Sequence, residues 1–364
     1  MSNKQRRQCL SRVPRWLFPT VLLCLYGFFK EFKPSEPFLN PFITHNRSDP
    51  NDPGKGFTNA VAEDDIYPYW TYSYLVAVVF ALILTDFLVY KPLIIIESLA
   101  YLATRVLLVA AFGLWSMRLM ELFYGIASAT EIAYYSYIYV MIDKKHYKYA
   151  SSFTRAAVLL GRALSGYLGQ ALYSTGVLNL LGLHYFSLAS VVVACVFALL
   201  LPNPPLSLFP CSGSQRCCRN LWNSVVSQLK QAAVDLKRFY FNPHLLKWSL
   251  WWAVATCGML QVANYVQPLW SDIASESSGG SEQNHRYYNG LVIATDTLVG
   301  SGGAFLVSLL KVNWSIWGEL LLGIFSVADC IFLFTASATS QLWLAYLCQI
   351  LFRGSYSFVI TIAT

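Results

Sequence analysis

Charged side chains are scarce in this sequence. Of its 364 residues, 12% are Asp, Glu, Lys or Arg, whereas 56% are hydrophobic. Soluble globular domains carry about 25% charged residues, so this composition excludes an ordinary soluble protein. The long apolar runs instead predict an all-α, polytopic membrane protein that lies largely in the lipid bilayer.

Signals for chemistry are also missing. The sequence contains no phosphate-binding glycine loop, no nucleophile elbow and no histidine pair at ligand spacing. Its nine cysteines are scattered and fit no zinc pattern. We therefore predict no catalytic residues, no metal site and no cofactor, and we expect that the protein is not an enzyme. The net charge of +7 indicates membrane topology rather than nucleic-acid binding, because much of it lies in segments predicted to be cytosolic.

Ten apolar runs predict the membrane-spanning helices. The first begins at about residue 16 and is expected to continue through the charged, proline-containing segment 30–38. The other nine span about residues 70–89, 92–114, 117–141, 153–174, 178–201, 245–270, 287–309, 315–335 and 340–364. A proline-rich, basic segment separates the sixth run from the seventh. The predicted parts are a cytosolic N-terminus (1–15), a six-helix bundle (16–201), a cytosolic linker (202–243) and an incomplete second bundle (244–364).

Charge asymmetry predicts which connections face the cytosol. Residues 1–15 contain five Lys or Arg and no acid, and the connection 143–148 is also basic. Basic residues collect on the cytosolic side, so the N-terminus is predicted to lie inside. Residues 41–66 read as an acidic, polar loop that contains the sequon Asn46-Arg-Ser. We expect this loop outside the cell, with Asn46 glycosylated.

One predicted helix carries polar residues along a single face. At about 100° per residue, Glu121, Tyr124 and Glu131 fall within one arc of roughly 80°, together with Ser128, Tyr135 and Tyr139. A carboxylate inside a membrane is costly and usually marks a substrate or ion path. The alternative is a structural ion pair between Glu121 and a nearby arginine.

Other polar features lie at membrane depth. Tyr67–Tyr74 is dense in aromatic rings, which fits either an interfacial belt or a cage for a planar or cationic ligand. Gln261 and Asn264 are helical neighbours that offer hydrogen bonds to a solute.

Several strings resemble the reduced folate and thiamine carrier family, a branch of the major facilitator superfamily. They occupy residues 33–38, 67–75, 85–92, 121–125, 131–139, 258–265, 314–319 and 360–364, in colinear order. The resemblance implies twelve helices in two six-helix bundles around a central cavity. Because about ten are expected here, we interpret the chain as a fragment or shortened form that lacks about two helices.

Position 131 separates the branches of this family. Thiamine carriers have Glu at this position and the folate carrier has Arg, and this sequence has Glu131. A carboxylate suits the positive charge of thiamine. The resemblance therefore implies a plasma-membrane carrier for thiamine that works by alternating access with proton coupling. The implied thiamine-binding residues are Glu36, Tyr67, Trp70, Glu121, Tyr124, Glu131, Tyr135 and Asn264.

Three residues depart from the family pattern. Arg105 replaces a Trp, Arg162 replaces an uncharged residue and Glu97 replaces a Gln. These arginines are expected either to neutralise the acids of the polar face or to attract an anion. Two alternatives to thiamine transport therefore stay open. They are a carrier for folate or another organic anion, and a shortened form that does not transport.

Overall fold

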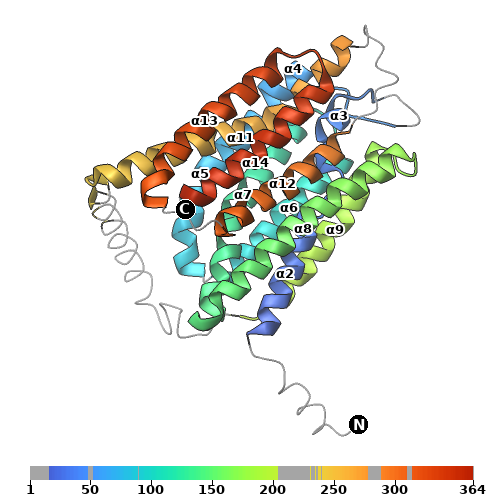
Figure 1. The fold of residues 1–364 in the computed structure, drawn as a ribbon. Coiled ribbons are helices and arrows are strands. Elements are labelled where there is room, and N and C mark those ends of the chain that lie inside the picture. The colour runs from blue at the N-terminus through green and yellow to red at the C-terminus, as the bar shows by residue number, and fades with distance from the viewer. Residues whose placement is uncertain are drawn as a thin grey trace, which may run out of the picture. The chain divides into compact units, whose positions relative to one another are not determined.

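The computed structural model describes residues 16–47, 52–88, 90–203, 230, 234, 237–238, 240–277, 288–309 and 314–363. Within these ranges the regular elements are all helical (Figure 1). Residues 1–15 and most of the predicted linker 202–243 lie outside the described residues.

All ten predicted long helices are present in the described residues. The first six are α2 (Leu17–Glu31), α5 (Pro68–Leu88), α6 (Lys91–Ala110), α7 (Leu114–Met141), α8 (Tyr147–Ser174) and α9 (Leu180–Leu200). The last four are α11 (Pro243–Ser277), α12 (Asn289–Leu309), α13 (Trp314–Ala338) and α14 (Leu342–Ala363). Apart from the end of α2, the largest boundary differences are at α8, which begins at Tyr147 rather than near residue 153, and at α11, which extends to Ser277 rather than to residue 270.

Four described segments are long and apolar enough to cross a membrane by length and composition alone. They are Lys91–Ala110, Leu180–Leu200, Trp317–Ala338 and Leu342–Ile362. Helices such as α7 carry ionisable residues and many tyrosines, which lower their mean hydropathy. A helix with such a polar face is stable in a bilayer when that face is turned toward other protein.

The first helix ends earlier than the sequence predicted. α2 stops at Glu31, and a short turn leads into the 3₁₀-helix η1 (Glu36–Phe38) and then into α3 (Leu39–Thr44). The prediction that the helix continues through Phe38 is therefore wrong. Proline lacks a backbone N–H and clashes with the preceding turn, so Pro34 and Pro37 do not allow one continuous helix.

The segment 41–66 is not simply a polar loop. At its two ends Phe42, Ile43, Ala62 and Ile66 are buried, and they pack in one apolar cluster that includes Met117 of α7. The short helix α4 (Asn59–Val61) and the π-helical turn η2 (Ala62–Ile66) lead into α5. The burial of a few apolar side chains at each end of this polar stretch holds it against the bundle.

The helices form two compact units. The first unit comprises residues up to 208 together with 283–298, and the second comprises 209–282 together with 299–364. In the first unit α2 packs against α8 and α9, and α7 packs against α5 and α6, as Figure 1 shows. In the second unit α14 packs against α13 and α11. The predicted division at 202–243 stays a prediction.

Two glycines let α8 and the first turns of α12 approach closely within the first unit. A Cβ atom added at Gly166 would lie 2.7 Å from the carbonyl oxygen of Gly290, and the reverse holds for Gly290 and Gly166. Small residues at such crossings permit tight helix contacts in membranes.

We predict that Gly166→Ala and Gly290→Ala each destabilise the protein by about 1–3 kcal/mol, because the added methyl group meets backbone rather than a flexible side chain. Thermal unfolding in detergent, followed by tryptophan fluorescence, measures the effect. Gly323→Ala on α13 is the control, since nothing lies within 4 Å of a Cβ atom there. Equal melting temperatures for all three variants would contradict the close contact.

Candidate functional site

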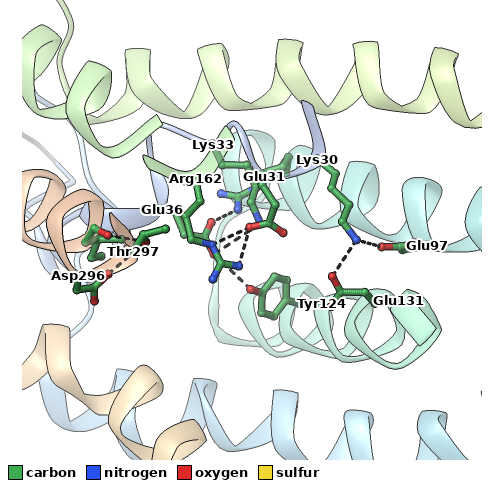
Figure 2. Close-up of polar contacts among 12 residues, drawn as sticks. Lys30, Glu31, Lys33, Glu36, Glu97, Tyr124, Glu131, Arg162, Asp296 and Thr297 are labelled. Atoms are coloured by element: carbon green, nitrogen blue, oxygen red, sulfur yellow. Dashed lines mark hydrogen bonds and ion pairs between the residues drawn. The ribbon is translucent and has the colours of Figure 1, made fainter. Parts of the chain in front are cut away.

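Ionisable side chains from α2, α6, α7 and α8 meet in the interior of the first unit (Figure 2). Charged groups are expensive to remove from water, so their pairing decides whether such an interior is stable. The structure places these residues around three centres, at Lys30, Glu36 and Arg162.

Lys30 connects two helices through their carboxylates. Its Nζ atom lies 2.7 Å from Glu97 Oε1 on α6 and 2.9 Å from Glu131 Oε1 on α7. Lys30 and Glu97 are fully buried, whereas the Glu131 side chain is 32% exposed. The Lys30 ammonium also lies 4.3 Å from the centroid of the Tyr134 ring, in reach of a cation–π interaction.

Glu36 is the second centre, at the start of η1. Its Oε2 atom is paired with Arg105 Nη2 from α6, and its Oε1 atom accepts a hydrogen bond from the Tyr124 hydroxyl at 3.3 Å. Lys33 Nζ lies 3.9 Å from Glu36 Oε1. Arg105 also donates to Ser35 Oγ at 3.2 Å. The Glu36 side chain, like that of Glu131, retains 32% exposure, so neither side chain is fully enclosed by protein.

Arg162 on α8 is paired with Glu31 at the end of α2. Its Nε and Nη2 atoms both donate to Glu31 Oε2, at 3.0 and 2.7 Å. The Arg162 side chain is 42% exposed and the Glu31 side chain 6%. Arg105 and Arg162 therefore form ion pairs with Glu36 and Glu31, not with the acids of the α7 polar face.

Glu121 differs from the other acids. Its side chain is only 4% exposed, and in the described part of the chain it forms no hydrogen bond or ion pair. Glu36 and Arg105 are the charged groups that act on it electrostatically. The alternative of a direct ion pair with a nearby arginine is therefore not supported.

Aromatic rings line the same region. The ring centroids of Trp70 on α5 and of Tyr101 on α6 each lie 5.9 Å from that of Tyr124. The Trp70 indole N–H donates to Ser128 Oγ at 3.2 Å, which fixes the orientation of the ring. The Tyr124 hydroxyl donates a hydrogen bond to Glu36, so an anionic group lies next to this group of aromatic rings.

The remaining predicted site residues lie elsewhere or have other contacts. The hydroxyl of Tyr67 donates to Asn40 Oδ1 at 2.9 Å, and the side chain is only 7% exposed. The ring of Tyr135 packs edge-on against Tyr134 at 4.9 Å and lies 6.0 Å from Lys30 Nζ. Asn264 lies on α11 in the second unit. The sequence-based roles of these three residues stay predictions.

Sequence reasoning did not give a role to Lys30, Glu31 or Lys33. All three lie in the charged segment 30–38, and the sequence alone indicates no partner for any of them. The usable signal was the pattern of opposite charges at membrane depth, since a charge buried there requires a counter-charge. Glu97 was noted as a departure from the family, but its partner Lys30 lies 67 positions away in the sequence.

The long helices are arranged as in solved structures of membrane transporters. The nucleoside transporter NupG matches with a TM-score of 0.65 at 13% identity, over 94% of this chain and 81% of that one. FucP, a major facilitator superfamily transporter, matches with a TM-score of 0.51 at 13% identity, over 96% of this chain and 89% of that one. At such identities the likeness shows the fold, which confirms the fold class predicted from the sequence.

The chain belongs to the reduced folate carrier family. The sequence model of that family matches residues 14–220 and 211–364. Thiamine transporter 2 of Macaca fascicularis is 37% identical over 392 residues, covering 96% of this chain and 76% of the relative. Folate transporter 1 of Caenorhabditis elegans is 36% identical over 367 residues, covering 96% and 78%. The family inferred from short motifs is thus confirmed.

The pairing at Arg162 leads to a stability prediction. Arg162→Met leaves Glu31 buried without its counter-charge, so we expect a loss of up to about 3 kcal/mol in the free energy of unfolding. The double variant Glu31→Gln/Arg162→Met removes both charges and should recover most of that loss. Thermal unfolding in lipid nanodiscs compares the two variants. A double variant that is less stable than Arg162→Met would contradict the ion-pair assignment.

Proposed function

We propose that this protein carries thiamine across the membrane by alternating access, without chemistry on the substrate. The relatives named thiamine transporters, at 35–37% identity over nearly the whole chain, support this proposal. Glu131 supports it as well, because the resemblance assigns Glu at this position to the thiamine branch.

The observation that carries the proposal is the proximity of partly exposed acidic side chains to aromatic rings. Thiamine combines a positively charged thiazolium ring with a planar aminopyrimidine. The side chains of Glu36 and Glu131 are each 32% exposed, Tyr124 contacts Glu36 through its hydroxyl, and the Trp70 ring lies next to the Tyr124 ring. Carboxylates and ring faces together attract a flat organic cation.

The proposed substrate-binding residues are those implied by the family resemblance. Glu36, Trp70, Tyr124 and Glu131 form the core of the proposal, because Tyr124 contacts both Glu36 and Trp70, and Glu131 follows Tyr124 by two turns of α7. Glu121 is proposed as the acid that takes up a proton during coupled transport, since it forms no ion pair in the described part of the chain. Tyr67, Tyr135 and Asn264 are proposed to complete the site.

We further propose a plasma-membrane location with the N-terminus and the 202–243 linker in the cytosol and with bundles at 16–201 and 244–364. The basic N-terminal residues favour this orientation. The Asn46 side chain is exposed, as an acceptor for a glycan must be. Its position next to the buried Ile43 means that the glycan would extend from the edge of the bundle.

A carrier for folate or another organic anion is the second candidate. Arg162 favours it, because its side chain is 42% exposed despite the ion pair with Glu31. An exposed guanidinium edge suits a carboxylate or a phosphate. Uptake of labelled folate in the same cells tests this candidate directly.

Glu131→Gln tests the thiamine proposal. We expect thiamine uptake to weaken by at least about tenfold, because the loss of one charge contact in a partly dehydrated site costs roughly 1–3 kcal/mol. Uptake of labelled thiamine is measured across concentrations, normalised to surface protein, with folate as competitor. Glu319→Gln is the control, since that carboxylate lies on α13 in an exposed pair with Lys247. Unchanged thiamine affinity in Glu131→Gln at normal surface level would remove Glu131 from the site.

The same assay tests proton coupling. A proton ionophore is expected to lower thiamine uptake by the wild type, because coupled transport depends on the proton gradient.

The uptake assay also decides between the two substrates. Saturable folate uptake without thiamine uptake would replace the thiamine proposal by the organic-anion candidate.

Asn46→Gln tests the proposed topology. Wild-type protein expressed in mammalian cells should shift to higher electrophoretic mobility after glycosidase treatment, whereas Asn46→Gln should already run at the deglycosylated position. An N-terminal epitope that antibodies reach on intact cells would contradict the proposed orientation.

A further inference from the structure

We propose that Lys30 is an internal cation that occupies Glu131 until a positively charged substrate displaces it. Lys30 would thereby set both the affinity of the site and its selectivity for cations. This inference rests on the proposed function in one respect, since it requires that the substrate carry a positive charge to Glu131.

The first argument is the charge balance around Lys30. One ammonium group is shared by Glu97 and Glu131, with Nζ–Oε1 distances of 2.7 and 2.9 Å. With all three groups ionised, one positive charge faces two negative charges. The triad therefore has an excess charge of −1, which one monovalent cation neutralises. A substrate cation at Glu131 would leave each carboxylate with one positive partner.

The second argument is the difference in exposure between the two carboxylates. Glu97 is fully buried, whereas Glu131 is 32% exposed. A ligand can therefore approach Glu131 but not Glu97. If Lys30 served only to neutralise Glu97, contact with the accessible carboxylate of another helix would not be needed. The Arg162–Glu31 pair shows the simpler arrangement, in which both donors meet one oxygen of one carboxylate.

The third argument concerns where Lys30 would go after it is displaced. Among the described residues, Glu97 Oε2 and the Tyr26 hydroxyl are buried and form no hydrogen bond of normal geometry. The ammonium of Lys30 lies 5.7 Å from the Tyr26 ring centroid and 4.3 Å from that of Tyr134. A small rotation toward Glu97 would exchange the Glu131 contact for a second hydrogen bond to Glu97. Lys30 thus keeps a buried acceptor and an aromatic face in both positions.

The proposed exchange predicts in which direction the affinity for cations changes when Lys30 is removed. In the resting arrangement the substrate must compete with a covalently tethered cation for Glu131, which lowers its apparent affinity. An anionic solute cannot displace Lys30, because it would meet two carboxylates. Removal of the tethered cation should therefore strengthen the binding of cations rather than weaken it, in contrast to the expectation for a residue that only stabilises the fold.

The double variant Lys30→Met/Glu97→Gln tests this inference. Lys30→Met alone would leave Glu97 buried without its partner and would risk misfolding. The double variant removes one positive and one negative charge, so the net charge is unchanged. Equilibrium binding of labelled thiamine to purified protein in lipid nanodiscs should become about tenfold tighter. Addition of Glu131→Gln to this variant should abolish the gain.

Lys247→Met/Glu319→Gln is the matched control. It removes the same pair of charges from α11 and α13, where both side chains are exposed, at 63% and 47%. Thiamine affinity should equal that of the wild type. Melting temperatures of all variants are measured in parallel, so that a change in affinity is compared only among folded proteins.

A second probe separates this inference from the thiamine proposal. Thermal stabilisation by choline and by tetramethylammonium reports cation binding without thiamine. If the wild type does not bind thiamine but the Lys30→Met/Glu97→Gln variant gains stabilisation by these cations, the thiamine proposal fails and the role of Lys30 stands. If the folded double variant binds neither thiamine nor the small cations more tightly than the wild type, the role of Lys30 is overturned.

Discussion

Ion pairing between different helices is the constraint on which the interior of the first unit depends. A charged group removed from water loses several kcal/mol unless a counter-charge replaces its hydration. Lys30 on α2 reaches α6 and α7, Arg105 on α6 reaches η1, and Arg162 on α8 reaches the end of α2. Because each pair joins two elements, the same contacts that neutralise the charges also hold the helices around the end of α2.

The break after α2 makes this arrangement possible. The turn between Glu31 and η1 replaces a regular helix with irregular backbone, and the Ser35 N–H donates to Ser187 Oγ of α9 at 3.0 Å. Backbone of this kind is tolerated at membrane depth only where protein surrounds it. Glu31, the last residue of α2, pairs with Arg162 of α8, and the turn that follows brings Glu36 to Arg105 of α6.

Substrate charge preference in such an interior is a property of the whole network. Glu131 carries the residue type of the thiamine branch, yet its oxygen is already in contact with Lys30. Arg105 and Arg162 add positive charge to the region, yet each is paired with a carboxylate. The accessible groups, rather than the total count of acids and bases, decide what a solute meets. On that criterion the carboxylates of Glu36 and Glu131 and the guanidinium of Arg162 matter most.

The sequence by itself determined the ten helices, the family and the polar face of α7. Apolar runs and the helical period are local properties, so neither required knowledge of distant residues. Pro34 and Pro37 also indicate the break after α2, although the apolar run alone predicts a helix that continues to residue 38. Only the tertiary structure decided which charges pair, because Lys30 and Glu131 are 101 positions apart and Arg162 and Glu31 are 131 apart. Such pairs depend on the rotation and crossing of packed helices, which periodicity along one helix does not fix.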